Sequence, residues 1–240
     1  MDILYIVIPA YNESSNIKSV IDAWYPIVES HNGGGLSRLV FINDGSTDHT
    51  YELLQEYEKE KPMLRALTKE NGGHGPAVMY GYHYALEQHA DYIFQTDSDG
   101  QTDPGEFEDF WKVRGEFAAI FGNRTRRGDG MSRAVVEKIL CRILKHYFHT
   151  SIPDANAPFR LMQAHFLETY LSKLPENYNL PNAVMTAMGG AFHEKIAFKE
   201  ITFHPRQGGV NSINVKKIFT IGWKAVRDFR QISLNLQGYV

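Results

Sequence analysis

The sequence is poor in cysteine and in long apolar runs, and both shortages limit what the chain can be. Cys141 is the single cysteine among 240 residues, which excludes an internal disulfide and a zinc site made by cysteines alone. No stretch approaches the roughly 18 uninterrupted apolar residues of a membrane-spanning helix. Residues 1–4 lead into a short apolar run without the basic flank of a signal peptide. We therefore expect a cytoplasmic protein in which Cys141 is a small core residue.

Two familiar nucleotide-binding motifs are missing as well. The tripeptide Gly-Lys-Ser/Thr does not occur, so the chain has no P-loop. A dinucleotide fingerprint needs glycines directly after the first strand, but here the first apolar run is followed by Pro9, Ala10 and Tyr11. The glycine-rich segment at 71–75 comes only after the third apolar run. A glycine-rich loop is thus present, but not in the place that a dinucleotide needs.

Charge is divided unevenly along the chain. Residues 1–110 contain 6 Lys and Arg against 19 Asp and Glu, whereas residues 111–240 contain 19 against 9. A basic half suggests an anionic partner, which is a phosphorylated substrate, a membrane surface or nucleic acid. Solvated helix faces would explain scattered lysines, but explain less well the arginine cluster at 124–133. Because this cluster has no interleaved aromatic residues, we do not expect nucleic acid.

Strand-like and helix-like segments alternate along the first half of the chain. Repeated strand–helix units, with 43% hydrophobic residues to form a core, predict a single α/β domain with a Rossmann-like, mostly parallel sheet flanked by helices. The expected strands are 5–8, 39–42, 64–67, 92–94 and 118–121, with an edge or antiparallel strand at 195–203. The expected helices start after Ser14 or Ser15, after Ser46 or Thr47, and at Pro76, with a fourth at 132–148. Loops are expected at 124–130, 152–160 and 177–182.

Polar residues follow several of these strands where each one ends. Asp44 follows the second strand, and Asp97 and Asp99 follow the fourth. In an open α/β sheet, ligands bind at this edge. Two carboxylates one residue apart need a counter-charge, which a divalent cation bridging them to a diphosphate supplies. Asp44 can accept a hydrogen bond from uracil or guanine, and Tyr11 offers a stacking surface. The alternative is an acidic turn with helix caps.

As a set, these motifs resemble the signatures of family 2 glycosyltransferases with the GT-A fold, over roughly residues 3–210. Within that family, Asp97-x-Asp99-x-Gln101 resembles the metal motif of dolichyl-phosphate mannose synthases and bacterial polyprenyl-phosphate glycosyltransferases. The resemblance implies that Asp97, Asp99 and Gln101 hold Mg²⁺ or Mn²⁺ against the diphosphate of a UDP- or GDP-linked sugar. It also implies a donor pocket formed by Pro9, Ala10, Tyr11, Glu13, Asp44, Gly73 and Asp97.

The resemblance extends to the acceptor. The arginine fork matches phosphate oxygens, and the arginines that correspond to the acceptor-phosphate region are Arg124, Arg127, Arg133 and Arg206. Asp154 lies in a segment similar to the family's Asp-x-x-Ser-Gly-Phe-Arg loop, with Ala157 and Pro158 in place of Ser-Gly. The implied catalytic set is Asp97, Asp99, Asp154, Arg124 and Arg133. Asp154 would be the general base if the acceptor were a hydroxyl, and would orient a substrate if it were a phosphate.

The implied activity is metal-dependent, inverting transfer of one sugar to an undecaprenyl- or dolichyl-type phosphate. Gln-x-x-Arg-Trp, the signature of processive polysaccharide synthases, is absent, which favours single transfer. Two alternatives stay open: a saccharide hydroxyl acceptor in cell-surface polysaccharide synthesis, and a catalytically silent sugar-nucleotide-binding subunit.

We assign residues 1–212 to the GT-A domain and 213–240 to a basic amphipathic helix and tail. That helix and the one at 132–148 have apolar and basic faces, which predicts a peripheral position at the inner face of a membrane, on its lipids or on a membrane subunit. Packing of the same helices on the sheet is the alternative.

Overall fold

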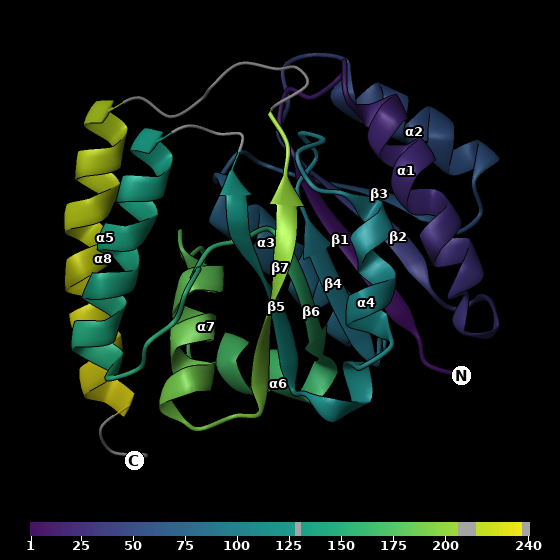
Figure 1. Cartoon of the computed structure of the whole chain (residues 1–240). Helices are drawn as coiled ribbons and strands as arrows, with labels where there is room; N and C mark the ends of the chain where they lie inside the picture. The colour runs from purple at the N-terminus through teal and green to yellow at the C-terminus, as the bar shows by residue number, and fades with distance from the viewer. Residues whose placement is uncertain (128–130, 206–214, 237–240) are drawn as a thin grey trace.

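Figure 1 shows the computed structural model, in which helices cover both sides of a seven-stranded sheet. The structure describes residues 1–127, 131–205 and 215–236. The strands are β1 (Leu4–Ala10), β2 (Arg38–Asp44), β3 (Leu64–Lys69), β4 (Tyr92–Thr96), β5 (Ala119–Arg127), β6 (Phe159–Gln163) and β7 (Ile196–Phe203). The α-helices are α1 (Ile17–Ser30), α2 (Thr50–Glu60), α3 (His74–Glu87), α4 (Phe107–Trp111), α5 (Met131–Phe148), α6 (Ala164–Leu171), α7 (Pro181–Ala191) and α8 (Val215–Leu236). Short 3₁₀ turns lie at Gly33–Gly35, Pro104–Glu106 and Arg114–Glu116.

The strand order in the sheet is β3-β2-β1-β4-β6-β5-β7. Strands β3, β2, β1 and β4 run parallel, and β6 alone is antiparallel to its neighbours β4 and β5. The last pair, β5 and β7, is parallel again. The predicted α/β class with a single, mostly parallel sheet is confirmed.

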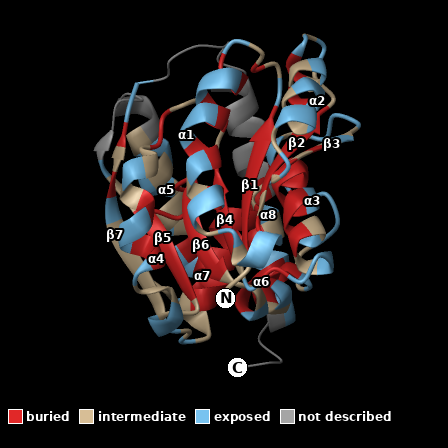
Figure 2. Cartoon of the chain, turned by 90° about the vertical axis from the view of Figure 1, so that its right-hand side faces the viewer, coloured by how far each residue is buried: buried red, intermediate tan, exposed pale blue. Residues whose placement is uncertain are grey.

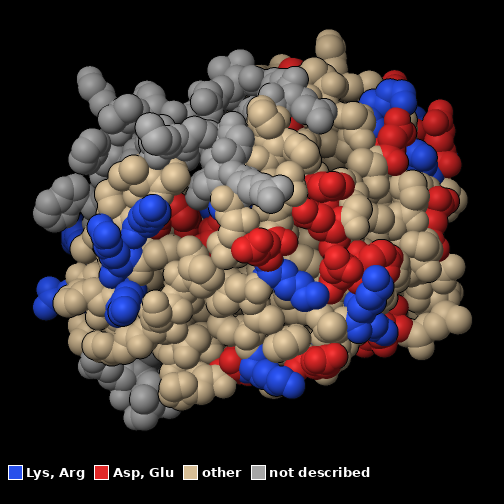
Figure 3. Space-filling view, viewed as in Figure 1, with Lys and Arg blue, Asp and Glu red and all other residues tan. Residues whose placement is uncertain are grey.

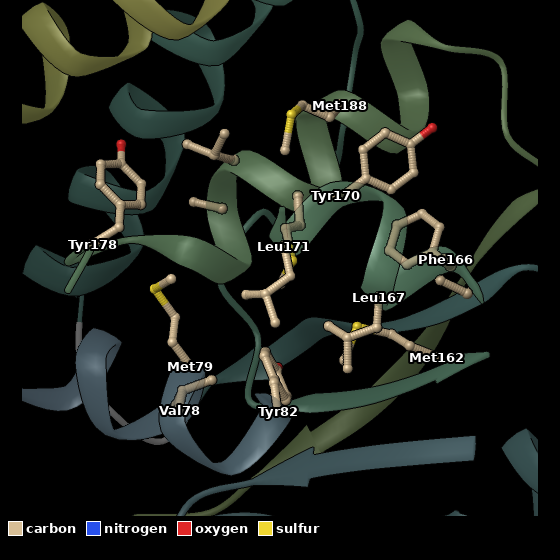
Figure 4. Close-up of a cluster of buried hydrophobic side chains, with 14 of the residues drawn as sticks. Val78, Met79, Tyr82, Met162, Phe166, Leu167, Tyr170, Leu171, Tyr178 and Met188 are labelled. Atoms are coloured by element: carbon tan, nitrogen blue, oxygen red, sulfur yellow. The ribbon is translucent and has the colours of Figure 1, made fainter. Parts of the chain in front are cut away.

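Side chains alternate between the two faces of the sheet, which explains why helices cover both. In β1, Leu4, Ile6 and Ile8 pack with α1, α2 and α4, whereas Tyr5 and Val7 pack with the core on the α3 side. Figure 2 shows the central strands β2, β1, β4 and β6 largely buried and the outer helix faces exposed. On the α3 side, buried side chains of α3, β6, α6 and α7 gather into one cluster (Figure 4).

The second half of the sheet differs from the predicted one in two places. The expected loop at 152–160 ends in β6, because Arg160 interrupts the apolar pattern of a strand that is nonetheless buried. The predicted loop at 124–130 begins too early, since β5 continues to Arg127. The strand expected at 195–203 as an edge or antiparallel strand is an edge strand, and it pairs parallel to β5. Similarly, the loop expected at 177–182 passes into α7 at Pro181.

The predicted helix caps are wrong. Helix α1 begins after Asn16 rather than after Ser14 or Ser15, and the Asn16 amide donates to the Glu13 carboxylate at 2.6 Å. Helix α2 begins after His49, and the Asp48 carboxylate accepts from the Thr50 N–H at 3.0 Å. At α2 the Asp48 carboxylate therefore satisfies the first helical N–H in place of Ser46 or Thr47, whereas the N-cap Asn16 of α1 makes no side-chain cap bond.

Helix α8 packs beside α5 on one flank of the molecule (Figure 1). Ala225, Phe229 and Ile232 are buried, and the Phe229 ring lies 6.4 Å from that of Phe148 at the end of α5. The predicted boundary between residues 212 and 213 lies outside the described residues. In the part of the chain that the structure describes, no helix combines the length and hydropathy needed to cross a bilayer.

Candidate active site

The loops that follow β1 and β2 are tied together at the carboxyl edge of the sheet. The Asn12 N–H donates to Ser46 Oγ at 3.0 Å, and the Thr47 N–H donates back to Asn12 Oδ1 at 2.8 Å. The Glu13 N–H donates to Thr50 Oγ1 at 2.9 Å. The two loops therefore form one rigid rim.

Asp44 organises the glycine loop that follows β3. Its buried carboxylate accepts from Lys69 Nζ at 2.9 Å and from the backbone N–H groups of Gly72 and Gly73 at 3.0 and 2.8 Å. Gly73 has a φ of 92°, a conformation that side chains disfavour. The structure thus brings two predicted donor-pocket residues, Asp44 and Gly73, into direct contact. Lys69, which the sequence analysis missed, balances the charge of Asp44.

The other predicted donor-pocket residues differ in how they are placed. Pro9 and Ala10 are buried within β1, so they shape the strand rather than present side chains. Tyr11 is 42% exposed at the rim and is available for stacking. Glu13 is buried and holds the Asn16 amide. Only Tyr11 of these four offers a side chain to a ligand in this arrangement.

The acidic loop after β4 is fastened at both ends. Asp97 Oδ1 accepts from Gln95 Nε2 at 3.0 Å and lies 3.8 Å from His74 Nε2 at the start of α3. Gln101 is buried, and its Nε2 donates to the backbone carbonyl of His204 at 2.8 Å, so a cation could reach this amide only through Oε1. The Gln101 N–H donates to Asp99 Oδ1 at 3.2 Å.

The acidic loop fits a hard divalent cation that shares its ligands with a substrate. Within residues 1–127, 131–205 and 215–236, no three His, Cys, Asp or Glu side chains gather closely enough to hold a metal alone. Mg²⁺ characteristically takes one or two carboxylates and completes its shell with water and phosphate oxygens. Partly exposed Asp97 and Asp99 supply that number of carboxylates.

A second ionic cluster joins β5, α5 and the loop before β6. Arg124 Nε and Nη2 contact the two carboxylate oxygens of Asp154 at 2.7 and 2.8 Å. Arg124 Nη2 also lies 3.3 Å from Glu137 Oε2 on α5, and Glu137 Oε1 accepts from the Ala155 N–H at 2.8 Å. All three ionic side chains are nearly buried. Arg124 is therefore the ion-pair partner of Asp154, and the structure brings these two predicted residues together.

The protonation of this cluster follows from its contacts. Burial raises the pKa of Asp154, but the hydrogen bonds and charge of Arg124 outweigh burial and hold it below the usual value. Burial and the Asp154 charge raise the pKa of Glu137. Cys141, one turn along α5, donates weakly to Glu137 Oε1 at 3.5 Å, and burial raises its pKa to about 12. Asp154 is thus a poor proton acceptor, and Cys141 is an unreactive thiol.

Arg160 is a further buried cation that the sequence analysis did not single out. Its guanidinium donates to Thr186 Oγ1 at 2.6 Å and to the Asn182 carbonyl at 3.1 Å, and it lies 4.2 Å from the centre of the Phe121 ring. Burial lowers its pKa to about 10. The only sequence signal is an arginine between Phe159 and Leu161.

The structure does not describe every predicted acceptor residue: the side chains of Arg127 and Arg133, and the whole of Arg206, lie outside the described part of the chain. Their role toward an acceptor phosphate stays a prediction.

The fold is that of an α/β protein with a mostly parallel sheet, a class in which ligands bind where the parallel strands end. The family model described as Glycosyl transferase family 2 matches residues 5–171. The chain belongs to this family.

Several curated proteins are similar to this chain. A dolichyl-phosphate beta-glucosyltransferase of Trichomonas vaginalis is 36% identical over 110 residues, which cover 44% of this chain and 32% of that protein. A putative glycosyltransferase of Bacillus subtilis is 23% identical over 239 residues, covering 99% and 70%. An undecaprenyl-phosphate 4-deoxy-4-formamido-L-arabinose transferase of Pectobacterium carotovorum is 25% identical over 169 residues, covering 69% and 50%. The chain thus spans between about a third and seven tenths of the length of these relatives.

Solved structures of GT-A glycosyltransferases share the fold. Mycobacterium tuberculosis glucosyl-3-phosphoglycerate synthase, crystallised with Mn²⁺ and UDP-glucose, has a TM-score of 0.67 at 16% identity, covering 97% of this chain and 79% of that one. Staphylococcus aureus TarS with UDP-GlcNAc has a TM-score of 0.61 at 18% identity, covering 90% and 62%. The predicted GT-A fold is confirmed.

Proposed function

We propose that this chain is the catalytic domain of a metal-dependent, inverting glycosyltransferase that moves one sugar from a nucleoside diphosphate sugar to a polyprenyl phosphate. The observation that carries the proposal is the pair Asp97 and Asp99 at the end of β4, with the Asp44-bound glycine loop of β3 beside it. The names of the curated relatives support a lipid-phosphate acceptor, and the Mn²⁺ and UDP-sugar complexes of structural neighbours support the donor.

On the donor side, each loop has a separate task. Asp97 and Asp99 would hold Mg²⁺ or Mn²⁺, which when bound neutralises charge on the departing diphosphate. Asp44 and the glycine loop would receive the nucleoside, with Tyr11 as the stacking surface. The start of α3 at His74, beside Asp97, directs the positive end of a helix toward the same place.

On the acceptor side, the Arg124–Asp154 pair favours a phosphate over a hydroxyl. A hydroxyl must lose its proton as it attacks, but the carboxylate of Asp154 is already held by two guanidinium nitrogens, and its pKa is lowered. A phosphate monoester has its second pKa near about 6 and is largely ionised at neutral pH, so it needs no base. Asp154 would then fix Arg124 and the loop before β6 rather than move a proton.

Helix α5 carries the surface that would meet the membrane. Val135 and Ile139 are 55% and 48% exposed, and Lys138, Arg142 and Lys145 are exposed on the same helix. An open groove of about 440 Å³ continues this surface toward α8, lined by Ile139, Arg142, Ile143, His146, Tyr147 and Val226. In Figure 3, Lys and Arg gather over the α5–α8 flank, while Asp and Glu predominate over the opposite one. Apolar and basic side chains together suit an anionic lipid surface.

Nucleotide binding that requires metal is the first expected result. A ligand that binds only the folded state at 100 times its Kd stabilises it by about 2.7 kcal/mol, or roughly 5–10 °C in Tm at this chain length. UDP or GDP should give such a shift with Mn²⁺ and little shift with EDTA. UMP, which lacks the second phosphate, is the control. Equal shifts with Mn²⁺ and with EDTA would contradict the proposed donor site.

Membrane attachment through α5 is the second expected result. Sedimentation should recover the protein with vesicles containing phosphatidylglycerol but not with phosphatidylcholine alone. Each basic residue near an anionic surface contributes about 1 kcal/mol, so changing Lys138, Arg142 and Lys145 together to Glu should weaken binding by about 100-fold or more. The matched control changes the exposed residues Lys18, Lys59 and Lys112 to Glu. Equal losses in the two triple variants would reject the α5 surface.

A further inference from the structure

A chain of buried side chains leads into Asp97 from the core. Gln95 Nε2 donates to Asp97 Oδ1 at 3.0 Å, Asn182 Nδ2 donates to Gln95 Oε1 at 2.8 Å, and the Tyr82 hydroxyl donates to Asn182 Oδ1 at 2.8 Å. Gln95 and Tyr82 are completely buried and Asn182 is 3% exposed. These residues come from β4, α7 and α3, so the chain of bonds crosses three elements. Figure 4 shows Tyr82 within the cluster under α6 and α7.

The direction of this chain is fixed by its Asp97 end. A carboxylate can only accept, so the Gln95 amide turns its nitrogen toward Asp97 and its oxygen toward Asn182. Asn182 then donates through Nδ2, which leaves its Oδ1 to accept from the Tyr82 hydroxyl. Every bond thus points toward the carboxylate, the arrangement in which successive bonds strengthen one another.

We propose that Tyr82, Asn182 and Gln95 form a positioning relay that presets Asp97 for the metal and the donor diphosphate. The relay engages Oδ1, which also faces His74. Among the described residues Oδ2 has no hydrogen bond, which leaves it as the oxygen with which Asp97 meets a cation. The inference rests on the proposed function. It gives a role to three buried polar side chains that do not themselves belong to the donor or acceptor loops.

A purely structural role explains the relay less well than a positioning role does. An amide that only has to be satisfied can bond to the backbone, as the partly buried Gln163 on the neighbouring strand β6 does with the carbonyls of Arg114 and Phe117. Gln95 instead donates to Asp97, the partly exposed first aspartate of the acidic loop. Second-layer partners of this kind orient metal ligands, and losing one typically costs about 10- to 100-fold in metal affinity.

The test compares nucleotide affinity with and without metal in the full chain. Calorimetry with UDP and with GDP, in Mn²⁺ and in EDTA, gives the factor by which the metal raises nucleotide affinity, called the metal enhancement below. Gln95→Met removes the donor to Asp97 and should reduce this enhancement by about tenfold while leaving the affinity in EDTA unchanged. Asn182→Leu and Tyr82→Phe act further from Asp97 and should cause smaller losses in that order. Tyr82→Phe removes one hydroxyl only, so it keeps the test available if the larger changes prevent folding.

Gln163→Met is the matched control, because it makes the same substitution on the adjacent strand away from the site. It should lower Tm without changing the metal enhancement. Wild-type enhancement in Gln95→Met, or an equal loss of affinity with and without Mn²⁺, overturns the relay while the proposed function stands. A wild-type protein whose UDP and GDP affinities both ignore Mn²⁺ overturns the proposed function and the relay together.

Discussion

Asp99→Asn should abolish the dependence of nucleotide binding on metal and lower turnover by roughly two to three orders of magnitude. The change removes one of two carboxylate charges from a loop that would hold a divalent cation against a diphosphate, and electrostatic groups at such sites contribute about this much. The fold should survive, since Asp99 is partly exposed and lies in a loop. Calorimetry with UDP and GDP, in Mn²⁺ and in EDTA, measures the binding effect directly.

Asp103→Asn provides the control for this experiment. Asp103 lies four residues further along the same loop, where its side chain accepts from the Gly105 N–H at 2.8 Å and starts a short 3₁₀ turn. It should leave the metal enhancement intact. If Asp99→Asn and Asp103→Asn behave alike, the acidic loop is a structural turn and the metal site is wrong.

Asp154→Ala should destabilise the protein by about 3–5 kcal/mol. It leaves the Arg124 guanidinium buried without its bidentate partner, and removing one member of a buried ion pair has a cost of this size. Replacing the whole cluster, as Arg124→Met with Asp154→Leu and Glu137→Gln, should recover much of the loss because no charge of the cluster remains buried. Urea denaturation of the single and triple variants gives the free energies of unfolding.

An exposed ion pair serves as the reference for these free energies of unfolding. Lys112 and Asp109 lie 3.4 Å apart with side chains 69% and 73% exposed, so Asp109→Ala should cost less than about 1 kcal/mol. A similar small cost for Asp154→Ala would mean that Asp154 is not committed to Arg124. It would then be available as a base, which is what a saccharide hydroxyl acceptor requires.

Continuous apolar runs made much of the fold predictable. Strands β1, β2 and β4 are buried on both faces, so their sequences are almost uninterrupted by polar residues. Strand β6 escaped prediction because the buried Arg160 divides it, and the charge of that arginine is accommodated by Thr186 and the Asn182 carbonyl of α7 and by the Ala155 carbonyl. Local sequence contains no sign of those distant partners.

The candidate site, like the fold, could be predicted only in part. Motifs located Asp44, Asp97 and Asp154, since each follows an apolar run or lies in a recognisable loop. Their partners could not be read from the sequence, because they come from elsewhere in the chain: Asn182 is 87 residues from Gln95, and Lys69 is 25 from Asp44. The pairing of Arg124 with Asp154, in particular, joins two residues that the sequence placed 30 positions apart, and their roles toward an acceptor stay predictions.

Sugar transfer to a lipid phosphate tests the central claim most directly. The purified protein, with Mg²⁺ or Mn²⁺, is incubated with a panel of UDP- and GDP-sugars and undecaprenyl phosphate, and the lipid products are identified by mass spectrometry. The account predicts a polyprenyl-phosphate product carrying a single sugar, formed only with metal and lost in Asp99→Asn. Transfer to saccharide hydroxyls while undecaprenyl phosphate remains unmodified, or donor binding without transfer to any acceptor, would contradict it.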